Sequence, residues 1–176
     1  MLKVDYSIED MTDPFAVETE TVDAGLFLSK FQFRFIPGPQ YEDLLNNNVS
    51  WIIVSPRLIS VLKSCRNASD LQLVELPESI FSPDERLKGF SILGVRRRVA
   101  CLDESRSDIR WGTLPSGKKH VLALYDFVLK ESQIPEDCDV FFIDEYPAYP
   151  VFSHELAAEI ATLYPRGFVY KEIEAL

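Results

Sequence analysis

The sequence predicts an α+β fold in a single domain, with a largely antiparallel or mixed sheet and two or three helices. Segments with strand-like composition outnumber segments with helical periodicity. The connections between strands are too short for repeated parallel crossovers, which favours antiparallel pairing. A chain of 176 residues, 47% of them hydrophobic, is long enough for one core. One domain is therefore expected over residues 1–176.

The N-terminal third combines polar segments with one aromatic strand. Residues 1–25 contain Asp, Glu and Thr with little periodicity, which predicts a loosely packed segment. Phenylalanines alternate with polar residues in 26–35, a pattern typical of a half-buried strand. A short polar helix is expected at 40–47, where the following asparagines favour a turn that ends it.

Two segments share the order strand, serine, helix. The strand at 51–55 leads to Ser55, whose hydroxyl is predicted to cap a helix. The apolar face of this helix consists of Leu58, Val61, Leu62 and Cys65. The strand at 149–152 leads to Ser153 and a helix that runs to about Leu163. Either a structural repeat or two independent helix caps explains the likeness.

The remaining strands are predicted from short apolar runs. They are the segments 71–76, 90–103, 120–129, 140–144 and 168–173. Gly94 near the middle of the second predicts a bulge, and 120–129 is read as a strand, although its composition also allows a helix. The segment 104–119 is polar with Trp111 inside it, and a surface loop is expected at 112–119.

Composition limits the function. The net charge of −10 and pI near 4.7 argue against a nucleic-acid ligand and are compatible with a basic protein partner. Cys65, Cys101 and Cys138 form an odd set without CxxC spacing, as expected for reduced, buried thiols in the cytoplasm. No apolar run is long enough for a membrane span.

Motifs that resemble catalytic sites fail at essential positions. His154-Glu155 begins like a zinc-protease helix, but Ala158 stands where the second histidine is needed. The segment 112–119 resembles a phosphate-binding loop, but Lys119 replaces the Ser or Thr that holds magnesium. We therefore expect no metal, no cofactor and no catalysis. A small hydrolase or transferase using His120 or His154 stays open as an alternative, as does an adaptor for another protein.

The segment 131–149 is the best candidate for a contact with a partner. Carboxylates are dense there, and the tyrosines that follow are held by prolines, which suits protein recognition. The candidate residues are Glu136, Asp137, Asp139, Asp144, Glu145, Tyr146 and Tyr149. A solvated rim, with tyrosines packed on the sheet, is the alternative.

Four segments occur in an order that is similar to a known family. They are WIIVSPRLISVL, FSILGVRRRVACLDESRS, VFFIDEYPAYPVFSHELAAEI and YPRGFVYKEI. Over residues 50–173 this order resembles immunity protein family eleven of bacterial polymorphic toxin systems. Two positions depart from the family: Gly94, where asparagine is common, and Phe152, where valine is usual.

The resemblance implies a non-enzymatic protein that binds a cognate toxin and blocks it. No catalytic residues carry over from the family, and the family does not specify the activity of the toxin. From charge alone, a basic toxin is compatible with this acidic chain.

Overall fold

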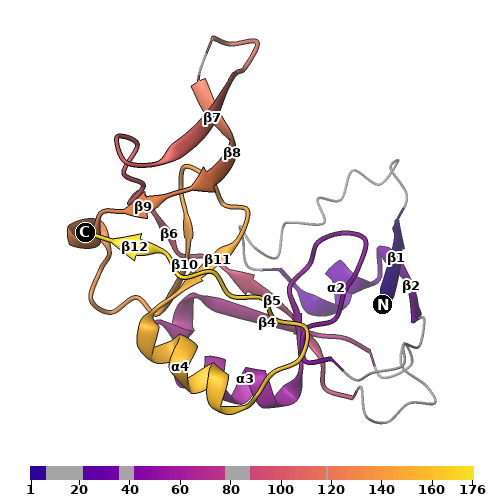
Figure 1. The fold of residues 1–176 in the computed structure, drawn as a ribbon. Helices are drawn as coiled ribbons and strands as arrows, with labels where there is room; N and C mark the ends of the chain where they lie inside the picture. The colour runs from indigo at the N-terminus through magenta and orange to yellow at the C-terminus, as the bar shows by residue number, and fades with distance from the viewer. Residues whose placement is uncertain (7–21, 36–41, 78–87, 118) are drawn as a thin grey trace.

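The computed structural model describes residues 1–6, 22–35, 42–77, 88–117 and 119–176. Within this part of the chain the fold is α+β, as predicted. Helices α3 (Pro56–Leu62) and α4 (His154–Thr162) lie side by side, and a long hairpin projects from the opposite end of the molecule (Figure 1). Most strand pairs are antiparallel.

The N-terminal part consists of β1 (Leu2–Tyr6), α2 (Ala24–Leu28) and β2 (Phe31–Phe35). The strand predicted at 26–35 is therefore wrong in its first half. Asp23 begins the helix, since its carboxylate accepts a hydrogen bond from the backbone N–H of Leu26 at 2.7 Å. β1 pairs antiparallel with β2.

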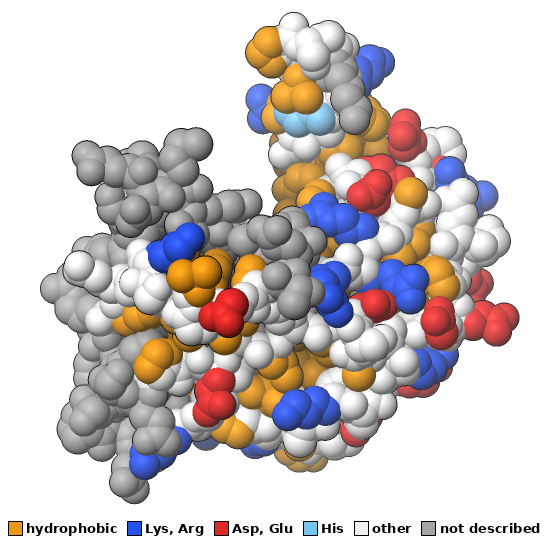
Figure 2. All heavy atoms as spheres, turned by 180° about the vertical axis from the view of Figure 1, so that it is seen from behind, with side chains coloured by type: hydrophobic (Ala, Val, Ile, Leu, Met, Phe, Trp, Pro, Cys, Tyr) orange, Lys and Arg blue, Asp and Glu red, His pale blue; other side chains and the backbone are white. Residues whose placement is uncertain are grey.

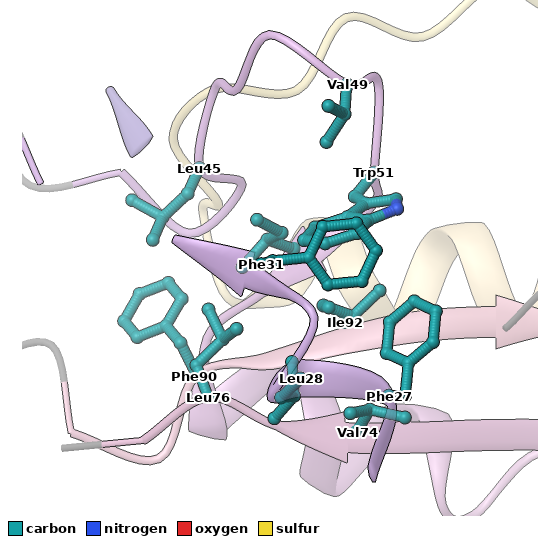
Figure 3. Packing of buried hydrophobic residues seen from close by; sticks show 11 residues of the cluster. Phe27, Leu28, Phe31, Leu45, Val49, Trp51, Val74, Leu76, Phe90 and Ile92 are labelled. Atoms are coloured by element: carbon teal, nitrogen blue, oxygen red, sulfur yellow. The ribbon is translucent and has the colours of Figure 1, made fainter. Parts of the chain in front are cut away.

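The segment 1–25, predicted to be extended or loosely packed, includes β1 and the first residues of α2. Residues 2–6 and 24–28 belong to regular elements, whereas 7–21 lie outside the described residues. The helix and β2 are fixed by aromatic packing: the ring of Phe31 meets Trp51 edge-on at 5.0 Å, and Phe27 packs on both (Figure 3). This cluster is the first of three in the core.

A turn replaces the short helix predicted at 40–47, of which 40 and 41 lie outside the described residues. Leu44 forms an antiparallel bridge with Val54. Asn47 closes the turn by accepting from the backbone N–H of Trp51 at 2.9 Å and donating to its carbonyl at 2.7 Å. An asparagine that satisfies the backbone in this way competes with helix formation.

The central sheet has the strand order β3 (Ile53–Val54), β5 (Ser91–Val95), β4 (Leu71–Glu75). The 3₁₀ helix η2 (Ala68–Asp70) precedes β4, so the strands predicted at 51–55 and 71–76 are confirmed in shorter form. Helix α3 packs beside this sheet in the second core cluster, with Leu58, Val61, Leu62 and Cys65 all buried, as predicted.

The single strand predicted at 90–103 is wrong, because β5 ends at Val95 and β6 (Arg98–Val99) joins another sheet. Arg97 lies between them, and its Nε donates to the carboxylate of Asp70 at 2.8 Å. Asp70 directly precedes β4, so this ion pair joins the chain after β5 to the start of β4. Gly94 pairs with Gln72 in continuous register, so the predicted bulge is absent there.

The projecting hairpin, here called the arm, consists of β7 (Asp108–Thr113) and β8 (Lys119–Asp126). The surface loop predicted at 112–119 is shorter than expected, because residues 112 and 113 belong to β7 and 119 to β8. The strand predicted at 120–129 is confirmed as β8 and β9 (Val128–Leu129). Gly117, with φ of +82°, forms the turn between the two arm strands.

The C-terminal part contains η5 (Glu131–Gln133), β10 (Val140–Ile143), β11 (Pro150–Phe152), α4 and β12 (Glu174–Ala175). β10 pairs antiparallel with β11 and parallel with β6, which confirms the strands predicted at 140–144 and 149–152. The strand predicted at 168–173 is wrong. Phe168 packs against the second core cluster and Ile173 against the third, so this segment spans two clusters before β12 pairs with β9.

Candidate partner-binding surface

Asp139, one of the predicted contact residues, is buried and belongs to the scaffold. It is 5% exposed. Arg66 donates to it through Nε at 2.9 Å and through its backbone N–H at 2.6 Å, and the Ser153 hydroxyl donates at 2.7 Å. The bonds from Arg66 outweigh burial and lower the pKa of Asp139 to about 2. Its predicted role at the surface is therefore wrong.

Asp43 occupies an equivalent buried position at 0% exposure. The Ser55 hydroxyl donates to it at 2.8 Å, the Arg57 side chain forms an ion pair with it, and the backbone N–H of Arg166 donates at 3.0 Å. Burial raises the pKa of Asp43, but these three partners outweigh burial and lower it overall. The prediction that Ser55 caps α3 is wrong, because the Ser55 hydroxyl donates to Asp43 and makes no cap hydrogen bond. Ser153 does cap α4.

The two carboxylates join the two strand–serine–helix units reciprocally. The backbone N–H of each serine donates to the carbonyl of its own aspartate, at 2.9 Å for Ser55 and 2.7 Å for Ser153. Each aspartate then accepts from the backbone N–H that follows the other unit's helix: Arg66 after α3, and Arg166 after α4. Matched contacts of this kind indicate an approximate two-fold arrangement. The sequence likeness is therefore accompanied by structural equivalence.

A groove of about 2740 Å³ lies beside these units. It is lined by α4, the loop before β11, the base of the arm and the C-terminal segment 168–176. In Figure 1 this last segment, drawn in yellow, runs from the end of α4 across the molecule to β12. Residues of the two units also line the groove, among them Leu58 of α3, Arg66 and Ser153.

Exposed aromatic side chains line the groove. Tyr125, Tyr149 and Tyr170 are 57%, 74% and 47% exposed, and Val169 is 97% exposed. The ring of Tyr170 stacks on Phe168 at 5.8 Å, which holds it in place. Tyrosines held in this way offer large contact area at a low entropic cost on binding.

The groove is also negatively charged. Its lining includes the glutamates Glu131, Glu136, Glu155 and Glu172. Three Lys or Arg residues, Arg66, Arg98 and Lys171, also belong to the lining. Arg66 pairs with Asp139, and Lys171 Nζ lies 3.0 Å from Asp126. Glu155 lies 3.9 Å from Arg66 at the margin of this pairing. Acidic groups beside exposed tyrosines suit a basic protein surface.

The structure divides the predicted contact residues. Glu136 and Tyr149 are exposed and line the groove. Asp137 and Asp144 are exposed but lie outside its lining. Glu145 and Tyr146 are half-buried.

Tyr146 packs against the third core cluster, so the packing interpretation holds for it. One carboxylate oxygen of Glu145 is buried without a hydrogen-bond partner, and after burial this charge is the next cause of the raised pKa of Cys101. Both residues therefore contribute to the interior and not to a contact surface.

Sequence reasoning missed the contribution of the C-terminal segment. Val169, Tyr170 and Glu172 line the groove, but the alternation in 168–173 was read as a strand. The available signal was the combination of aromatic and acidic residues after Gly167, which repeats the chemistry of the segment 131–149.

The groups proposed for a small enzyme are not assembled in the described part of the chain. The three cysteines are buried, and burial raises the pKa of Cys101 and Cys138 to about 11. His154 is exposed at the start of α4, and His120 Nδ1 is buried without a partner. Among the described residues no three His, Cys, Asp or Glu side chains form a group that could hold a metal ion.

Comparison of the chain with protein-family models and with curated proteins finds no match. No helix in the described ranges is both long and apolar enough to cross a membrane.

Proposed function

We propose that this chain is an immunity protein that acts in the cytoplasm, binding a cognate bacterial toxin and neutralising it by occlusion, without catalysis of its own. The observation that carries the proposal is the groove, in which exposed tyrosines lie beside glutamates. The order of motifs that resembles immunity protein family eleven gives the class of partner. The negative lining favours a toxin with a basic surface.

The contact is expected to depend on both aromatic area and charge. Tyr149 and Tyr170 contribute the area, because they are exposed before binding and line the groove. Glu136 and Glu172 contribute charge that no basic side chain in the described residues neutralises. Truncating a tyrosine near the centre of an interface to alanine commonly lowers the binding free energy by about 2 kcal/mol or more.

Co-expression with the neighbouring toxin-like reading frame tests the proposal. The wild-type chain is expected to restore growth and to copurify with the toxin, whose mass should be unchanged after the encounter. Tyr149→Ala combined with Tyr170→Ala should weaken binding by about thirtyfold or more. Glu136→Lys combined with Glu172→Lys should slow association with a basic toxin.

Matched variants control for surface changes in general. Tyr164→Ala removes a tyrosine that is 87% exposed but outside the groove lining. Glu75→Lys combined with Glu104→Lys makes the same charge change at exposed positions elsewhere. Both controls should bind like the wild type. If neighbouring toxins neither bind the chain nor lose toxicity in its presence, the proposed function is wrong.

A further inference from the structure

The arm has the opposite chemistry to the groove. Within residues 109–122 the sequence contains three Lys or Arg residues and no Asp or Glu, although the chain carries a net charge of −10. Arg110 and Lys119 are exposed on its two strands. The arm is therefore a local basic element on an acidic protein.

The arm also exposes large apolar side chains. Trp111, Leu114 and Leu122 are 41%, 41% and 48% exposed. Figure 2 shows hydrophobic and basic side chains together on the projecting arm. Gly112 permits close cross-strand packing, because a Cβ there would lie 2.8 Å from both His120 and Leu122. The arm therefore presents exposed apolar area on both of its strands, and such area is typical of interaction sites.

The arm of one molecule does not lie in its own groove. Leu124 and Tyr125 at its base line one end of the groove, and the hairpin projects away from the rest of the molecule (Figure 1). Among the residues that the structure describes, no groove residue thus covers the basic, apolar end of the arm. A second copy offers both the glutamates and the tyrosines that complement it.

We propose that two copies of this chain form a symmetric dimer by exchanging arms, with each arm lying in the groove of the other copy. A symmetric dimer contains the arm–groove contact twice, so the free energies of two modest contacts add. At physiological ionic strength the repulsion between the net charges is screened beyond about 8 Å, whereas contacts between arm and groove are not. The dimer does not depend on the identity of the toxin. It would, however, compete with any partner for the groove.

Sedimentation and light scattering of the purified full chain, over a concentration series without toxin, test the dimer. The expected mass is twice the 20.1 kDa of one chain. Arg110→Glu with Lys119→Glu in the arm, or Glu136→Lys with Glu172→Lys in the groove, should each weaken dimerisation by about tenfold to a hundredfold. The surface controls Glu75→Lys and Glu104→Lys should leave it unchanged.

Mixing the two charge-reversed proteins gives the sharpest result. In the mixed dimer one contact is wild type and the other has both charge signs reversed, so dimerisation should recover. A monomer at every concentration overturns the proposal, as does a dimer that both sets of variants leave intact. Copurification of nucleic acid with a monomer, lost on Arg110→Glu with Lys119→Glu, would instead make the arm a nucleic-acid contact and also overturn it.

Discussion

Replacing Asp139 by asparagine should destabilise the protein substantially. The carboxylate accepts from the backbone N–H and guanidinium of Arg66 and from the Ser153 hydroxyl. Its pKa falls on folding from 3.8 to about 2, which corresponds to about 2 kcal/mol of stability at neutral pH. Asparagine also turns an NH₂ group toward these donors, so the total loss should be about 2–4 kcal/mol. In a chain of this size that lowers Tm by about 5–15 °C.

Urea and thermal unfolding followed by circular dichroism measure this loss. Asp137→Asn is the matched control, because its side chain is 71% exposed and lies 3.8 Å from Arg97. It should change stability by less than about 0.5 kcal/mol. Asp43→Asn should resemble Asp139→Asn in size, because the two carboxylates have equivalent partners. Equal stabilities for Asp139→Asn and Asp137→Asn would refute the reasoning.

The pH dependence gives a second check on Asp139. Because folding lowers its pKa, the stabilisation is fully present above the unfolded value of 3.8 and is lost as the pH falls through about 2. The Asp139→Asn variant has no carboxylate to titrate at this position. The stability difference between wild type and variant should therefore shrink over this interval. A constant difference would show that the charge of Asp139 contributes nothing.

Two further predictions concern backbone conformation and thiol reactivity. Gly167→Ala should lower the free energy of unfolding in urea by about 2 kcal/mol, because φ is +86° and the new Cβ would lie 3.0 Å from the carbonyl of Leu44. Gly117→Ala should lower it by about 1 kcal/mol, because φ is +82° but the space around the new Cβ is open. The cysteines should resist a thiol reagent in the folded protein and react quickly in urea, since at pH 8 a thiol with a pKa of about 11 is ionised to about one part in a thousand; rapid labelling of the folded chain would contradict their burial.

Local patterns predicted the elements whose causes are local. The unit around Pro56–Leu62 combines an apolar strand, a proline at the first helical turn and an apolar face, and each acts within a few residues. The same holds for Ser153 and α4. The long apolar run at 90–103 shows the limit. β5 stops where its partner β4 begins, at Leu71, and the chain then pairs with β10, so the break depends on residues distant in the sequence.

The candidate site was predicted only in part, because some of its residues are placed by local sequence and others by contacts between distant residues. Glu136 and Tyr149 were identified from composition, and composition is what makes them suitable for a contact. Asp139 lies in the same acidic segment but is part of the buried scaffold, because Arg66, 73 positions away, binds its carboxylate. A usable signal was present: an aspartate precedes the serine at the start of each helix, Asp43 before Ser55 and Asp139 before Ser153.

The approximate two-fold arrangement is held by backbone contacts as well as by the two carboxylates. After α3, the side-chain oxygen of Asn67 accepts from the backbone N–H of Asp139 at 2.9 Å; after α4, the carbonyl of Arg166 accepts from that of Asp43 at 3.0 Å. The equivalent contact is thus kept with different atoms. A scaffold held by such buried contacts tolerates little change, since losing one partner leaves a buried polar group unsatisfied.

The groove draws its exposed tyrosines and glutamates largely from the base of the arm, the segment 131–136, the loop before β11 and the C-terminal segment. These segments make few of the buried polar contacts that join the two units. Their side chains can therefore change with little cost to the fold. Under the proposed function, this arrangement would allow the contact surface to change to match one toxin while Asp43 and Asp139 keep the two units together.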